Sequence, residues 1–207
     1  MANKLNLAVF VSGRGSNLKA ILNRNDLLPL VTVKGVFSDK IDCPAFEIAR
    51  EFSIPTFHIS FSTKTPYDVA SVLIAEFKSL DIDLIVLAGF LKLIPGTVIK
   101  EYRDKIINIH PALLPSFGGK GMFGMNVHKA VFNSSAKVSG ATIHFVNEIY
   151  DEGKIINQKA VDISALKSPD EIALRVLEVE HLLLPDTIKL FANNKIKIIN
   201  NRVEILN

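Results

Sequence analysis

The chain has 207 residues, which suits one α/β domain, and a hydrophobic fraction of 48% is ample for a packed core. The net charge of +3, from 24 basic and 21 acidic residues, is too small to indicate nucleic-acid binding, although it could help to attract anionic substrates. We therefore expect small-molecule partners and no nucleic acid.

The single cysteine, Cys43, excludes an intrachain disulfide and indicates a reducing compartment. Cys43 precedes a proline at a predicted helix start and has no base near it in sequence, which favours packing over a nucleophilic role. The first residues read as a strand and not as a signal peptide, because a small-residue cleavage pattern is missing. No run approaches the roughly 18 apolar residues that span a bilayer. We expect a soluble, cytoplasmic protein that is not bound to a membrane.

The first half alternates short apolar runs with amphipathic stretches. Strands are expected at 5–11, 31–38, 54–60 and 83–90, and helices at 16–24, 43–52 and 67–80. Strands that alternate with helices, without hairpin signals, predict right-handed crossovers and a mostly parallel twisted sheet with helices on both faces. The fold class is therefore expected to be a Rossmann-like α/β domain.

The second half changes character after a strand at 105–109. The segment 117–125 contains four glycines, which predicts a mobile loop that could close over a substrate. A helix is expected at 126–133, an antiparallel strand pair at 138–148 and 154–163, a long helix at 169–193, and a hairpin at 196–206 that turns at Asn200-Asn201. The antiparallel pair is expected at the C-terminal edge of the sheet. We expect one domain over 1–207.

The first candidate site is SGRGSN, residues 12–17, between the first predicted strand and helix. Gly13 and Gly15 permit a tight turn, and the amides of Gly15, Ser16 and Asn17 would lie at a helix N-terminus, which attracts anions. The segment matches neither G-x-G-x-x-G nor the P-loop, so it specifies neither a dinucleotide nor ATP. It predicts a phosphate site, and the alternative is a turn in which Ser16 is an ordinary N-cap.

The second candidate site is N-x-H-P-x-L-L-P, residues 108–115. Alternation along a strand puts Asn108 and His110 on one face, and open α/β sheets bind ligands at the carboxyl ends of their strands. An amide beside an imidazole can stabilise an oxyanion, and the imidazole can move a proton near neutral pH. Pro111 and Pro115 stiffen the turn. The alternative is a structural histidine at a strand end.

Asp151, in the segment IYDEG, could pair with His110, fix its tautomer and raise its pKa. The alternative is an ordinary turn. No bound metal is expected, because the spacing of the other histidines matches no metal site, and no G-x-S-x-G elbow supports a serine hydrolase. These other histidines are His58, His128, His144 and His181.

Five segments between about residues 5 and 195 occur in a characteristic order and spacing: SGRGSNL, LAGFLKLI, NIHPALLP, HFVNEIYDEGKII and LRVLEVEHLLLP. In these segments the chain resembles the phosphoribosylglycinamide formyltransferases. The most specific feature is the Asn-x-His pair followed by an Asp about forty residues later. This feature also belongs to the wider folate-dependent formyltransferase superfamily, and the SGRGSN loop and short length select the glycinamide ribonucleotide branch.

The resemblance implies a formyltransferase fold that transfers a formyl group from 10-formyltetrahydrofolate to the amine of glycinamide ribonucleotide, in purine synthesis. It implies a phosphate-binding half over about 1–105, a folate-binding and catalytic half over about 106–207, and a monomer or a homodimer. The implied catalytic trio is Asn108, His110 and Asp151.

The resemblance also assigns binding residues. Ribonucleotide contacts are implied for Gly15, Ser16, Asn17, Leu177, Glu178, Val179 and Glu180. Folate contacts are implied for Lys64, Leu91, Lys92, Leu93, Ile94, Asn108, Asn147, Glu148, Ile149, Tyr150 and Asp151. Without the family, Glu180 would read as a solvated helix charge. Lys64 stands where the family commonly has an arginine, so it keeps the charge but loses the planar fork.

The expected reaction is direct transfer through a tetrahedral intermediate, whose oxyanion is held by Asn108 and a protonated His110. Asp151 would keep His110 charged and organise a water that carries the proton from the amine to the folate nitrogen. Three rivals remain. A transferase acting on methionyl-tRNA would carry a C-terminal RNA-binding domain, and a formyltetrahydrofolate hydrolase an N-terminal regulatory domain; neither is expected here. A silent nucleotide-binding module would keep SGRGSN without the trio.

Overall fold

The structure is a computed structural model that describes residues 4–206. It contains two compact units, Met1–Ile107 (unit 1) and Asn108–Asn207 (unit 2). Seven strands follow the order β3-β2-β1-β4-β5-β6-β7 in one sheet, and β8 and β9 form a separate pair. The single domain expected over 1–207 stays a prediction.

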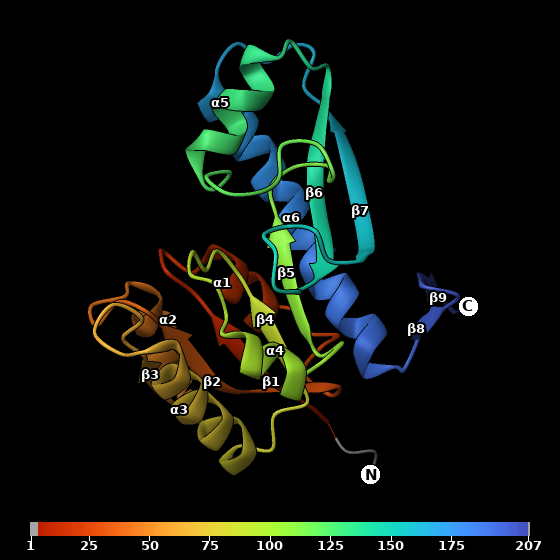
Figure 1. Cartoon of the computed structure of the whole chain (residues 1–207). Helices are drawn as coiled ribbons and strands as arrows, with labels where there is room; N and C mark the ends of the chain where they lie inside the picture. Colours follow the sequence, from red (N-terminus) through yellow and green to blue (C-terminus); the bar gives the residue numbers. More distant parts are fainter. Residues whose placement is uncertain (1–3, 207) are drawn as a thin grey trace. The chain divides into compact units, whose positions relative to one another are not determined.

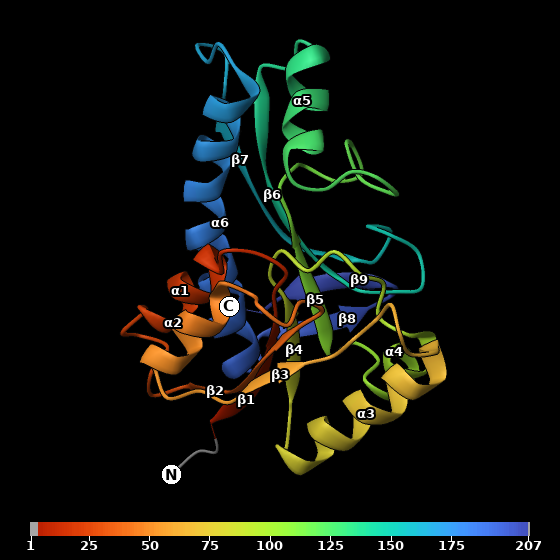
Figure 2. The same ribbon diagram turned by 90° about the vertical axis from the view of Figure 1, so that its left-hand side faces the viewer.

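Unit 1 alternates strands with helices along the chain. Its elements are β1 (Leu5–Phe10), α1 (Ser16–Leu22), β2 (Val31–Ser38), α2 (Ala45–Glu51), β3 (Thr56–His58), α3 (Pro66–Ser79), β4 (Leu84–Leu87) and α4 (Gly96–Glu101). Strand β1 pairs in parallel with β2 and β4, and β2 pairs in parallel with β3. Helices α1 and α2 lie together on one face of these strands, and α3 and α4 lie on the other (Figures 1 and 2). The parallel sheet with helices on both faces is confirmed.

Cover on both faces explains why β4 and the last four residues of β1 are apolar without alternation. All four residues of β4 are buried, as are the last four of β1. Phe10 stacks on Phe37 with ring centroids 5.0 Å apart, and Phe77 of α3 meets both rings edge-on at 5.9 and 5.4 Å. This core holds β1 and β4 in place. The chain continues from β1 into segment 12–17 and from β4 toward segment 91–94, both of which are expected to bind substrates.

Unit 2 begins within β5, which runs across the boundary between the units. Its elements are β5 (Ile106–His110), α5 (Met125–Asn133), β6 (Val138–Phe145), β7 (Ile155–Asp162), α6 (Pro169–Ala192), β8 (Ile196–Ile199) and β9 (Arg202–Ile205). Strands β6 and β7 pair antiparallel, with β7 at the sheet edge, as expected. Helix α6 packs along both strands and against α5 (Figure 1).

The ends of the elements follow local sequence rules. Thr65 and Asp68 form a capping box at the start of α3, and Ser168 caps α6 by accepting the Glu171 N–H. The predicted hairpin turn is confirmed: Asn200 and Asn201 join β8 to β9, both with positive φ. Within residues 4–206, no helix combines the length and the apolar character that a membrane crossing needs.

Candidate active site

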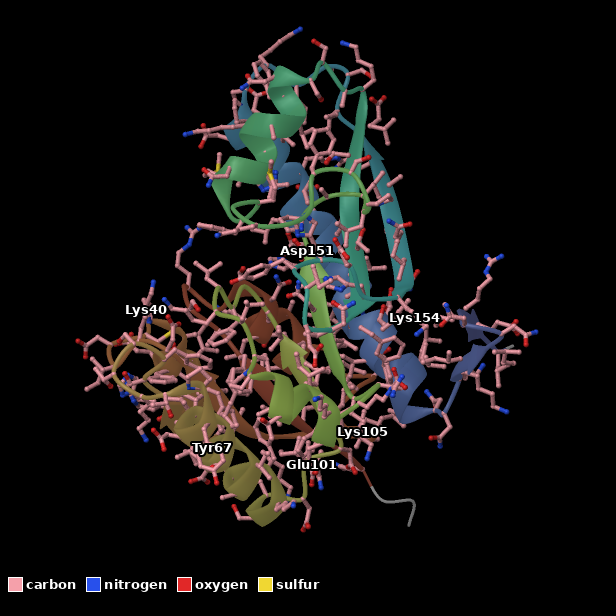
Figure 3. The ribbon with its side chains drawn as sticks, in the orientation of Figure 1. Lys40, Tyr67, Glu101, Lys105, Asp151 and Lys154 are labelled. Carbon is pink, nitrogen blue, oxygen red and sulfur yellow. The ribbon has the colours of Figure 1, made fainter. Side chains whose placement is uncertain are left out.

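Four side chains of unit 2 form a polar cluster. Strand β5 supplies Asn108 and His110, and β6 supplies His144. The loop between β6 and β7 supplies Asp151, which is labelled in Figure 3. The Asp151 carboxylate lies 3.5 Å from Nδ1 of His110 and 3.5 Å from Nε2 of His144. The amide nitrogen of Asn108 lies 3.1 Å from the same Nε2 of His144. The structure thus brings together the three residues proposed as a catalytic trio and adds a second imidazole.

The His110 side chain is 3% exposed and fixed in orientation. Its Nε2 donates to the carbonyl oxygen of Phe117 at 2.9 Å, because a carbonyl oxygen can only accept. Burial lowers the pKa of His110; Asp151 and the Phe117 carbonyl oppose this without overcoming it, and His144 adds to the lowering. Asp151 therefore acts on the pKa of His110 in the expected direction, and the expectation that it keeps His110 charged during the reaction stays a prediction. The lowered pKa favours the neutral imidazole in the chain without substrates.

Asp151 is held as a carboxylate in this cluster. Burial raises its pKa, but the neighbouring rings of His144 and His110 and the backbone N–H of Gly119 together hold the pKa below its usual value. The Gly119 N–H lies 2.9 Å from Oδ2. Asp151 itself has φ 59°, in the left-handed region that Asp and Asn tolerate better than most residues. The Asp151 carboxylate thus faces a His110 ring whose pKa is lowered by burial.

Sequence reasoning missed His144 because it tested the histidines only for metal-ligand spacing. Its Nδ1 lies 2.8 Å from the Phe145 carbonyl oxygen and therefore carries a hydrogen. In the neutral ring Nε2 is then an acceptor, which fixes the Asn108 amide with its nitrogen toward His144. One amide hydrogen of Asn108 remains for a ligand. A signal was present: His144 lies in a predicted strand, seven residues before Asp151.

The glycine-rich loop contacts the cluster through its backbone. Phe117 accepts from His110 and Gly119 donates to Asp151, with φ values of 57° and 96°. A Cβ on Gly118 would lie 2.5 Å from Leu114 Cδ2 and 3.2 Å from the Asp151 Cβ. The glycines of this loop therefore allow its backbone to approach the two ionisable side chains.

The SGRGSN segment of unit 1 forms the expected turn into α1. Gly15 is the N-cap at φ 76°, and a Cβ there would lie 2.6 Å from the Ala45 Cβ, so both conformation and space require glycine. The N-cap residue is Gly15, which has no side chain to cap the helix, and Ser16 is the first helical residue, so the alternative of Ser16 as an ordinary N-cap is wrong. Ser12 anchors the segment by donating to Asp39 at 2.7 Å and accepting the Leu91 N–H at 3.3 Å.

Helix α6 carries the predicted segment 177–180. Glu180 is 8% exposed, so its reading as a solvated helix charge is wrong. Glu178 is exposed and pairs with Arg175 at 2.7 Å, and Val179 is buried. A buried carboxylate is costly unless it serves a partner or a ligand, which makes Glu180 the informative residue of this segment.

The residues expected to contact folate lie in loops of both units. In unit 1, Lys64 is exposed just before α3, Leu91 and Leu93 are exposed after β4, and Ile94 is buried. In unit 2, the segment 147–150 includes the exposed side chains of Ile149 and Tyr150. Their folate contacts stay predictions. Among the described residues, no group of three or more His, Cys, Asp or Glu side chains could hold a metal ion.

Comparison with known proteins identifies the family to which this chain belongs. Residues 5–188 match the family described as formyl transferase. The phosphoribosylglycinamide formyltransferase of Escherichia coli (strain K12) is 33% identical over 95% of this chain and 92% of its own length. The chloroplastic enzyme of that name from Arabidopsis thaliana is 43% identical over 92% of this chain, which spans 66% of its length.

The chain thus spans slightly less than two thirds of that first plant relative. The crystal structure of glycinamide ribonucleotide transformylase 1 from Symbiobacterium toebii superposes with a TM-score of 0.91 at 32% identity, covering 100% of this chain and 96% of that one. The chain therefore belongs to the formyl transferase family, among the phosphoribosylglycinamide formyltransferases.

Proposed function

We propose that the chain transfers the formyl group of 10-formyltetrahydrofolate to the amine of glycinamide ribonucleotide, giving the N-formyl product and tetrahydrofolate. The observation that carries the proposal is the contact between buried His110 and half-buried Asp151 beside the oriented amide of Asn108. An amide, a neutral imidazole and a carboxylate match the needs of formyl transfer to an amine: an oxyanion donor, a proton acceptor and a counter-charge. Membership in the family supports the choice of substrates.

Asn108 and His110 act on the tetrahedral intermediate. The ribonucleotide amine attacks the formyl carbon, and the free amide hydrogen of Asn108 stabilises the oxyanion that develops. Because the pKa of His110 is lowered by burial, the imidazole starts neutral and can accept a proton from the amine. Its new N–H then faces Asp151, which stabilises the imidazolium while the oxyanion exists. A water held by Asp151 carries the proton on to the folate nitrogen, and no covalent enzyme intermediate forms.

The substrates are bound by the segments described above. The start of α1, at Gly15, Ser16 and Asn17, holds the ribonucleotide phosphate, supported by the positive end of the helix dipole. Segment 177–180 contacts the ribonucleotide, with Glu180 accepting from the ribose hydroxyls or the glycinamide end. Segments 91–94 and 147–151, with Lys64, lie along the folate. We propose a cytoplasmic monomer or homodimer, although the plant relatives are named chloroplastic.

The test is formyl transfer by the purified chain, followed by the absorbance of the folate product. We expect product only when both 10-formyltetrahydrofolate and glycinamide ribonucleotide are present. Release of formate at an equal rate without the ribonucleotide would identify a hydrolase instead. Binding of the ribonucleotide with no turnover of the folate would identify a silent binding module. Either result would refute the proposed function.

A further inference from the structure

A hydrogen-bond network links the edge strand β7 to the turn that follows His110. The buried hydroxyl of Thr142, on β6, donates to the Ala112 carbonyl at 2.7 Å and accepts the Leu114 N–H at 3.0 Å. The side-chain amide of Gln158, on β7, donates to this hydroxyl and to the Leu114 carbonyl, both at 2.9 Å. One donated and two accepted bonds use the whole capacity of the hydroxyl. Gln158 therefore fills the last position of a saturated network.

The register of the sheet explains how Gln158 reaches this turn. Thr142 and Gln158 are direct cross-strand partners in the antiparallel pair of β6 and β7. Directly opposite residues have neighbouring side chains on the same face of the sheet, so the two side chains meet. Gln158 is nevertheless an exposed residue of an edge strand. Gln158 therefore contributes to the structure through its two hydrogen bonds and not through burial of its side chain.

The turn at Leu114 leads within five residues to the two backbone groups that contact the catalytic pair. The Phe117 carbonyl accepts from His110, and the Gly119 N–H donates to Asp151. Both groups belong to a loop with several positive φ angles, which a loosely held start would leave free to move. The anchoring of Leu114 thus decides whether the loop backbone stays against His110 and Asp151.

We propose that Gln158 is a positioning residue for formyl transfer: through Leu114 and Thr142 it holds the loop backbone against His110 and Asp151. The inference rests on the proposed function for its kinetic readout. Gln158 touches no reacting group. Loss of its two hydrogen bonds releases the turn, and the loop then spends part of its time away from the catalytic pair.

The experiment compares Gln158→Met, which keeps length and volume but removes both donors, with Gln158→Glu, which replaces the donors by acceptors. Lys159→Met makes a similar change one residue along the strand, on the opposite face, and serves as the control. We expect both Gln158 variants to lower kcat by roughly tenfold, the equivalent of two ordinary hydrogen bonds, with little change in KM. Gln158→Glu should be at least as impaired, and the control should match the parent chain.

A pH profile separates positioning from a general structural defect. The hydrogen bond to the Phe117 carbonyl raises the pKa of His110. If the loop backbone moves away from the ring, this pKa falls, and the part of the pH–rate profile that reports His110 shifts to lower pH. The other ionisable groups that face His110 are Asp151, His144 and His128, and both Gln158 variants leave them in place. A merely structural role for Gln158 would lower the rate without shifting this part of the profile.

Proton NMR titration of the His110 ring, assigned by its loss in His110→Asn, gives a readout that needs no turnover. If the parent chain transfers no formyl group, the proposed function fails, and the titration still tests whether Gln158 acts on His110. A His110 titration and pH profile unchanged in Gln158→Met would overturn the positioning role. Unfolding of both Gln158 variants would also overturn it, because the residue would then be structural.

Discussion

Replacement of Asp151 by asparagine tests whether the negative charge of Asp151 stabilises the protonated form of His110. Asparagine keeps the shape, tolerates the left-handed backbone at this position and can still accept the Gly119 N–H. It removes the negative charge that faces His110. At the 3.5 Å separation seen here, unit charges attract by about 5 kcal/mol with an effective dielectric constant of about 20. The protonated form of His110, needed while the intermediate exists, loses stabilisation of that order.

The expected result of Asp151→Asn is a kcat that falls by roughly 100- to 10,000-fold, the range for loss of an acid–base partner. The pKa of His110 should fall below its value in the parent chain, because Asp151 is the larger of the two causes that raise it. Steady-state formyl transfer and NMR titration of the His110 ring measure the two effects. A near-normal kcat, or a His110 titration that does not move to lower pH, would refute the reasoning.

Two further substitutions probe the proposed ribonucleotide site. Gly15→Ala should destabilise the chain by about 1–3 kcal/mol in denaturant unfolding, because its Cβ would lie 2.6 Å from the Ala45 Cβ at φ 76°. Gly13→Ala, which meets nothing within 4 Å, is the control, and equal losses would contradict the steric argument. Glu180→Gln should raise KM for the ribonucleotide by roughly 10- to 100-fold at unchanged kcat. An unchanged KM in the kinetic assay would remove Glu180 from the site.

Periodicity and turn chemistry predicted most of the fold. The continuous apolar runs at β1 and β4 read as buried strands, and the Asn200-Asn201 pair marked the hairpin turn. Helix α4 was not predicted, because its six residues are too few for a helical repeat of apolar positions to be recognised. Asn108, His110 and Asp151 were found because the first two alternate on one strand and the family pattern pointed to the third.

The features that sequence could not supply all depend on tertiary surroundings. Whether Glu180 is solvated or buried depends on what packs against α6. The protonation state of His110 depends on a balance between burial and the nearby carboxylate, and no spacing rule weighs those two effects. Gln158 itself belonged to no motif, and its role emerges only from the cross-strand register with Thr142.

The most direct test of the account is the rate of formyl transfer from 10-formyltetrahydrofolate to glycinamide ribonucleotide by the parent chain and by His110→Asn, measured side by side. The account predicts turnover by the parent chain and a loss of roughly 100- to 10,000-fold in the variant, the range for loss of a proton acceptor, with the fold intact by circular dichroism. A folded variant that turns over at the parent rate would contradict it.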